Sequence, residues 1–170
     1  MLRKKALLIL AALLTMALCS ACAAEAPLRL HIMANSDSDS DQQIKMEVRD
    51  AVLLATAQGI EDCENEADAE EYISGNLEII EATANAVLED NGVDYTAHAQ
   101  IGTFHFPDRT YGDVTYPEGD YRAVRIILGE GEGHNWWCVM FPPLCISEIT
   151  GEDTEYTSFF GELWEKWFGV

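Results

Sequence analysis

Basic residues are scarce in this chain of 170 residues, which has 10 Lys and Arg against 30 Asp and Glu and a formal net charge of −20. Nucleic acids and anionic membranes bind proteins through clustered Lys and Arg that displace counterions from phosphates. We therefore expect no nucleic-acid binding and no strong binding to anionic membranes. We interpret the many Asp and Glu residues as a well-solvated surface; the alternative is that they bind a basic patch on a partner.

The sequence motifs of common enzyme classes are also missing. There is no Gly-x-Ser-x-Gly, no P-loop, no His-Glu-x-x-His and no Gly-rich fingerprint that opens a helix, and residues 24–170 contain no Cys-x-x-Cys. Asp37, Asp39 and Asp41 resemble the first ligands of a calcium loop, but Gln42 and Val48 stand where such a loop needs Gly and Glu. We therefore expect no catalytic residues, no metal and no cofactor.

Long apolar runs are rare, and the run from Ala6 to Leu18 is too short for an ordinary membrane span. It follows the basic residues 3–5 and precedes the small residues Ala21-Cys22-Ala23, which is the layout of a secretory signal. Cleavage after Ala23, giving a signal peptide of residues 1–23, is the simplest interpretation. Lipidation at Cys22 and an uncleaved anchor are the alternatives. In each case residues 24–145 are predicted to be a secreted domain.

Three cysteines follow the predicted signal, and an odd number outside the cytoplasm suggests one disulfide and one free thiol. We predict a disulfide between Cys138 and Cys145, because the turn-forming Pro142-Pro143 lies between them. Cys63 lies in a polar stretch and would remain free.

Hydrophobic periodicity predicts an α+β fold with an N-terminal strand, two amphipathic helices and then a mainly antiparallel sheet of about three further strands. Residues 106–120 are rich in Gly, Pro and Asp and are predicted to form turns. Beyond Cys145 we expect a flexible acidic segment, 146–157, and an amphipathic C-terminal tail, 158–170, that docks on the domain or anchors a partner. The predicted strands are 28–33, 95–106, 121–128 and 135–141, and the predicted helices are 41–58, capped by Ser40, and 66–90.

The stretch GEGHNWWCVMFPPLC, residues 131–145, places His134 and Cys138 near two tryptophans. Along an extended strand these two residues lie roughly 13 Å apart, whereas a base must lie within roughly 3 Å of its nucleophile. Cysteine catalysis is therefore a secondary hypothesis. Because neighbouring strand residues point to opposite faces, one of Trp136 and Trp137 should enter the core while the other faces a covering element or a partner.

Two blocks of sequence, residues 28–53 and 116–145, resemble the stage II sporulation protein R family of endospore-forming bacteria. The specific parts are the ANSDS and GHNWWCVMFPPLC segments, and the likeness extends over residues 28–145. The resemblance implies a secreted signalling protein, made in the forespore and exported into the space between forespore and mother cell. There it would activate a membrane-embedded aspartic protease, stage II sporulation protein GA, which processes the sigma-E precursor in the mother cell.

The resemblance implies a protein partner but carries no contact residues with it. Exposed polar turns beside an aromatic anchor are typical of recognition surfaces. We therefore take as candidate partner-binding residues Asn35, Ser36, Asp37, His134, Asn135, Trp136 and Trp137. The alternative function is a secreted cysteine-dependent cell-wall or peptide hydrolase that uses Cys138 and His134.

Overall fold

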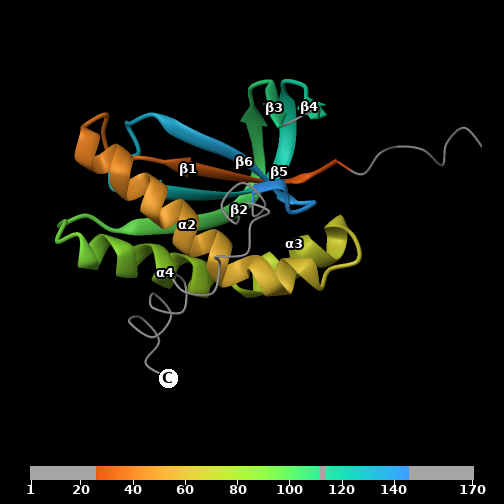
Figure 1. Ribbon diagram of the computed structural model, residues 1–170, viewed down its shortest axis with the longest axis horizontal. Coiled ribbons are helices and arrows are strands. Elements are labelled where there is room, and N and C mark those ends of the chain that lie inside the picture. Colours follow the sequence, from red (N-terminus) through yellow and green to blue (C-terminus); the bar gives the residue numbers. More distant parts are fainter. Residues whose placement is uncertain (1–25, 112–113, 146–170) are drawn as a thin grey trace, which may run out of the picture.

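The computed structural model describes residues 26–111 and 114–145. Three helices lie along one face of a sheet, and a short hairpin projects from the other side (Figure 1), which confirms the predicted α+β class. The predicted signal peptide 1–23, acidic segment 146–157 and tail 158–170 lie outside the described residues. In chain order the elements are β1 (Leu28–Met33), α2 (Asp39–Glu61), α3 (Glu66–Gly75), α4 (Leu77–Asp90), β2 (Ala97–Phe106), β3 (Arg109–Tyr111), β4 (Val114–Tyr116), β5 (Gly119–Leu128) and β6 (Asn135–Phe141).

The main sheet has four strands in the order β2-β5-β1-β6. β1 is parallel to β5 and antiparallel to β6, and β2 is antiparallel to β5, so two of the three pairings are antiparallel. β3 and β4 form a separate hairpin where the sequence predicted turns. Facing side chains stabilise this hairpin: the hydroxyls of Thr110 and Thr115 lie 2.9 Å apart, and the rings of Tyr111 and Tyr116 meet edge to face.

The helices cover the sheet face that carries Leu28, Leu30 and Ile32 of β1, all completely buried. These side chains join buried residues of β5 and β6 and of all three helices in one core cluster. Each fully buried Leu or Ile contributes about 1.5–3 kcal/mol by leaving water. The helix-facing side of the sheet is therefore the main source of stability.

The first helix is longer than predicted at both ends. Ser38, not Ser40, caps it, accepting a hydrogen bond from the N–H of Asp41 at 3.1 Å. Gly59 does not stop it, because Ile60 is completely buried in the core and holds the last turn in place. The burial of one apolar side chain outweighs the roughly 1 kcal/mol by which Gly disfavours a helix.

The predicted helix 66–90 is divided into α3 and α4 at Asn76, whose backbone leaves helical geometry at φ −116° and ψ 14°. Gly75, which precedes it, is a weak helix former, and the Asn76 side chain donates to the carbonyl of Tyr72 at 2.7 Å. Ile73 of α3 and Ile80 of α4 both lie in the core, so the apolar face continues on either side of the break.

Both faces of β1 are buried, whereas its alternating pattern predicted only one. Arg29 is completely buried and His31 is 3% exposed. They lie on the face away from the helices, where the hairpin and neighbouring strands form an aromatic cluster that surrounds the Arg29 guanidinium. The aromatic cluster consists of Phe106, Tyr111, Tyr116, Tyr121 and Trp137.

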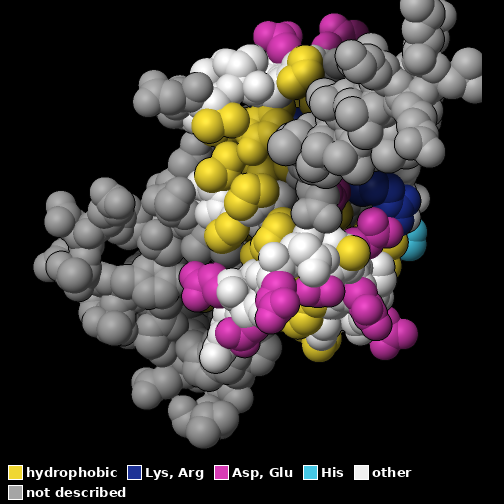
Figure 2. Space-filling view, turned by 90° about the vertical axis from the view of Figure 1, so that its right-hand side faces the viewer, with side chains coloured by type: hydrophobic (Ala, Val, Ile, Leu, Met, Phe, Trp, Pro, Cys, Tyr) yellow, Lys and Arg dark blue, Asp and Glu magenta, His cyan; other side chains and the backbone are white. Residues whose placement is uncertain are grey.

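The acidic surface is unevenly distributed at the end of the molecule seen in Figure 2. Hydrophobic side chains form a patch in the upper half of the view, and Asp and Glu side chains gather below, where Figure 1 places α3. Helix α3 alone carries Glu66, Asp68, Glu70 and Glu71. Acidic side chains also lie at the top edge of this view, so acidic surface borders the apolar patch above and below.

Candidate functional site

The β1–α2 loop and the β5–β6 loop meet and are hydrogen-bonded along their length. The N–H of Gly133 donates to the carbonyl of Ala34 at 2.9 Å, and that of Glu132 to the carbonyl of Asn35 at 3.2 Å. A Cβ atom at Gly133 would lie 2.2 Å from the carbonyl oxygen of Ser36. Only glycine permits this approach, so the two predicted recognition loops form one rigid unit.

Asp37 joins the two loops through His134. Its carboxylate accepts from the backbone N–H of His134 at 2.6 Å and lies 2.5 Å from the imidazole Nδ1. Lys45 of α2 donates to the carbonyl of His134 at 2.9 Å, and burial lowers the pKa of its ammonium group. The structure thus brings together the predicted residues Asn35, Ser36, Asp37, His134 and Asn135.

Asp41 holds the base of this unit. Its buried carboxylate accepts from Ser36 at 2.5 Å, Asn35 at 3.0 Å and the Tyr95 hydroxyl at 2.6 Å. These hydrogen bonds, first those from Ser36 and Tyr95, lower the pKa of Asp41 to about 2. Burial and the same contact raise the pKa of Tyr95. Asp41 is therefore an ionised structural anchor, a role that the sequence analysis did not assign to it.

The two tryptophans lie on opposite faces of the sheet, and both are half-buried. Trp136 packs against the main core, with the Arg49 guanidinium of α2 4.6 Å from its ring centroid. Trp137 lies on the other face and stacks on His31 at 3.8 Å. Burial lowers the pKa of His31 to about 4, so this imidazole is neutral at pH 7. Trp137 is thus the tryptophan that lies on the sheet face opposite the described helices.

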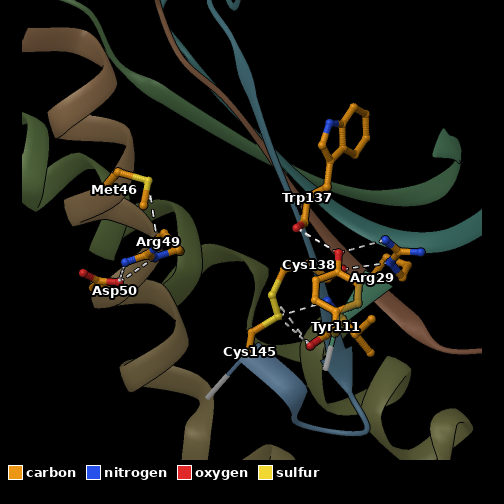
Figure 3. The surroundings of a disulfide bond; sticks show 9 residues. Arg29, Met46, Arg49, Asp50, Tyr111, Trp137, Cys138 and Cys145 are labelled. Carbon is orange, nitrogen blue, oxygen red and sulfur yellow. Dashed lines mark hydrogen bonds and ion pairs between the residues drawn. A yellow bond between two sulfur atoms is a disulfide. The ribbon is translucent and has the colours of Figure 1, made fainter. Parts of the chain in front are cut away.

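The structure joins Cys138 and Cys145 in a disulfide and leaves Cys63 free. Both bonded residues are buried. Figure 3 shows the disulfide beside β6, with Trp137 pointing away from it and Arg29 and Tyr111 near the strand. Burial raises the pKa of the free Cys63 thiol, which makes it less reactive at neutral pH.

Replacing both bonded cysteines with alanine is expected to lower the free energy of unfolding by about 2 kcal/mol, because the crosslink closes a short loop. Chemical denaturation measures the difference, with Cys63→Ala as the control, which we expect to change stability by about 0.5 kcal/mol or less. Equal stability of wild type and double variant would mean that the crosslink contributes nothing.

The arrangement offers little for catalysis by a thiol. Cys138 is buried in β6 and disulfide-bonded to Cys145. The His134 imidazole lies in the loop before β6 and contacts the carboxylate of Asp37. Among residues 26–111 and 114–145, no group of three or more His, Cys, Asp and Glu could hold a metal ion. Within these same ranges, none of the helices has the length and apolar character of a membrane span.

Sequence reasoning missed the functional potential of the sheet face opposite the helices. Phe104, Arg125 and Ile127 lie on the same face of the sheet as Trp137, although they are far apart in the chain. The alternation in the strands indicated which side chains share a face. It could not indicate that the described helices would all lie on the other face.

A family model described as stage II sporulation protein R matches residues 24–151. A curated protein named stage II sporulation protein R, from Bacillus subtilis strain 168, is 41% identical over 123 residues. The matched region is 72% of this chain and 55% of the relative, so the chain spans about half of that protein's length. No solved structure gives a significant match.

Proposed function

The chain belongs to the stage II sporulation protein R family, and from this premise we propose that it is an exported signal that activates a membrane-embedded aspartic protease during sporulation. The protease is stage II sporulation protein GA, and its substrate is the sigma-E precursor of the mother cell. The signal acts from the space between forespore and mother cell. The family match over residues 24–151 is the observation that carries this proposal.

The geometry of the described residues supports a ligand more than a hydrolase. The one candidate nucleophile of the alternative function, Cys138, is buried in a disulfide. The polar loops are instead built as a rigid, exposed unit around Asp37 and His134. A preorganised surface binds a partner with a small loss of conformational entropy.

Co-expression of this chain with the protease and the sigma-E precursor should produce cleavage of the precursor, detected by immunoblot. The same chain without residues 1–23 should produce none, because it would not leave the cytoplasm. The variant that carries both Cys138→Ala and Cys145→Ala should still trigger cleavage, provided that it is exported and folded.

Failure of exported, folded wild type to trigger cleavage would reject the proposed function. Loss of activity in a folded double-alanine variant, together with thiol-dependent hydrolysis of a peptide or cell-wall substrate by wild type, would favour the hydrolase.

A further inference from the structure

We propose that the sheet face opposite the helices is the docking surface for a segment of the partner protease that presents a carboxylate among apolar side chains. This inference rests on the proposed function for the identity of the partner. The docking residues, called the open face below, are Met33, Gln100, Phe104, Arg125, Ile127 and Trp137.

The open face is continuous across the four strands of the main sheet. The register aligns Gln100, Arg125, His31 and Trp137 in one row, and Ile127 and Met33 in the next. All six open-face side chains are half-buried, while the described helices cover only the opposite side of the sheet (Figure 1). Large apolar groups that remain accessible on a rigid sheet are typical of an interaction site.

Charge distinguishes this face from the rest of the chain. None of the six residues is acidic, although the chain carries 30 Asp and Glu. Among the described residues, Arg122 is paired with Glu70 and Arg49 with Asp50, whereas no carboxylate forms an ion pair with Arg125. The open face therefore presents an uncompensated cation amid apolar groups, and charge complementarity calls for a carboxylate.

Arg125 is held in place for such a contact. Its guanidinium lies 3.6 Å from the centroid of the Phe104 ring, and its Nε is buried without a hydrogen-bond partner. A guanidinium binds a carboxylate through two parallel hydrogen bonds. Because the stacked side chain is already ordered, little further entropy is lost when the carboxylate arrives.

Two other modes of association fit less well. Addition of a strand along the outer edge of β6 is opposed because the Tyr111 hydroxyl donates to the carbonyl of Trp137, and the N–H of Val139 donates to the Cys145 sulfur. A symmetric dimer through the open face would pair the same patch on both copies and place two Arg125 guanidinium groups in one interface without adding a carboxylate from that patch. A carboxylate-bearing partner avoids both problems.

The test combines charge reversal with site-specific photocrosslinking in the co-expression system. Arg125→Glu should reduce precursor cleavage at least about tenfold, whereas Arg109→Glu, the same change at an exposed residue of β3, should alter it less than about twofold. Circular dichroism and denaturation confirm that both variants fold. A photocrosslinking amino acid at Gln100 should capture the protease, and one at the exposed Ile79 of α4 should not.

Mass spectrometry of the crosslink supports the proposal if the captured protease peptide contains Asp or Glu, and if its replacement by Arg restores activity to Arg125→Glu. Normal activity of folded Arg125→Glu would overturn the proposal. Capture of residues 146–170 of this chain, of a second copy, or of the protease through Ile79 alone would also overturn it.

If wild type triggers no cleavage, the proposed function fails separately. Photocrosslinking from Gln100 in sporulating cells then tests whether the open face is a docking surface. The docking surface is supported if a peptide of another protein that contains Asp or Glu is captured, if its capture is lost with Arg125→Glu, and if exchanging the two charges restores it. If no such peptide is captured, the docking surface is rejected.

Discussion

Replacing Arg29 with alanine is expected to lower the free energy of unfolding by about 4 kcal/mol. The Arg29 side chain is completely buried, and its guanidinium lies 4.5 Å from the ring centroid of Phe106 and 4.9 Å from that of Tyr121. Its Nε donates to the carbonyl of Cys138 at 2.9 Å, and its Nη2 to the Tyr111 hydroxyl at 3.2 Å. Alanine would remove these contacts together and leave a cavity beneath the β3–β4 hairpin.

Urea unfolding followed by tryptophan fluorescence measures this effect. Arg109→Ala is the matched control, because Arg109 is exposed and donates to the carbonyl of Asp108 at 2.9 Å, and should cost about 0.5 kcal/mol or less. Arg29→Met retains much of the side-chain volume without the charge and should fall between the two. An Arg29→Ala variant as stable as Arg109→Ala would show that the aromatic cluster does not depend on Arg29.

Replacing Asp41 with alanine is expected to cost about 3 kcal/mol at neutral pH, because it leaves Ser36, Asn35 and the Tyr95 hydroxyl without their common acceptor. The effect should depend on pH. The pKa of Asp41 is lowered to about 2 in the folded protein, so as the pH falls the Asp41 carboxylate is protonated at a higher pH in the unfolded chain than in the folded one. Its contribution is therefore complete above the unfolded pKa, near 4, and is lost as the pH falls toward 2.

Comparing wild type with Asp41→Asn isolates this carboxylate from the many others. The difference in unfolding free energy should shrink by about 2 kcal/mol between about pH 4 and pH 2. Asp39→Asn, at an exposed residue of the same helical turn, controls for the loss of one negative charge. A difference that does not change with pH would contradict the role of Asp41 as an ionised anchor.

Local patterns predicted the local parts of the fold. The alternation of LRLHIM placed β1 at residues 28–33, and the aromatic and β-branched run NWWCVMF placed β6 at 135–141. The division at Asn76 was missed because the apolar periodicity continues across it, and the break is visible in the backbone angles of Asn76 and in its hydrogen bond to Tyr72. Burial of Arg29 was missed because it depends on Tyr111 and Tyr116, from a segment whose composition indicates turns.

The candidate loops were partly predictable, because their positions also follow from local sequence patterns. The polar composition of Asn35-Ser36-Asp37 and the position of His134 before β6 indicated two turns. That these turns share hydrogen bonds follows from the pairing of β1 with both β5 and β6, a long-range property that periodicity does not encode. Arg125 lies in the predicted strand 121–128, but that no described carboxylate forms an ion pair with it became visible only in the assembled sheet.

The position of β1 has a consequence for when the chain can fold. β1 is the first described strand, yet both of its neighbours, β5 and β6, come from the last part of the described chain. Contacts between distant segments form late, because a long loop must close before they are made. A chain emerging from the ribosome can form α2 to α4 early, but β1 has no partner strand until β5 is synthesised, and the sheet is complete only after β6. Under the proposed export, this delay would keep the chain in a conformation loose enough to be threaded through a membrane channel.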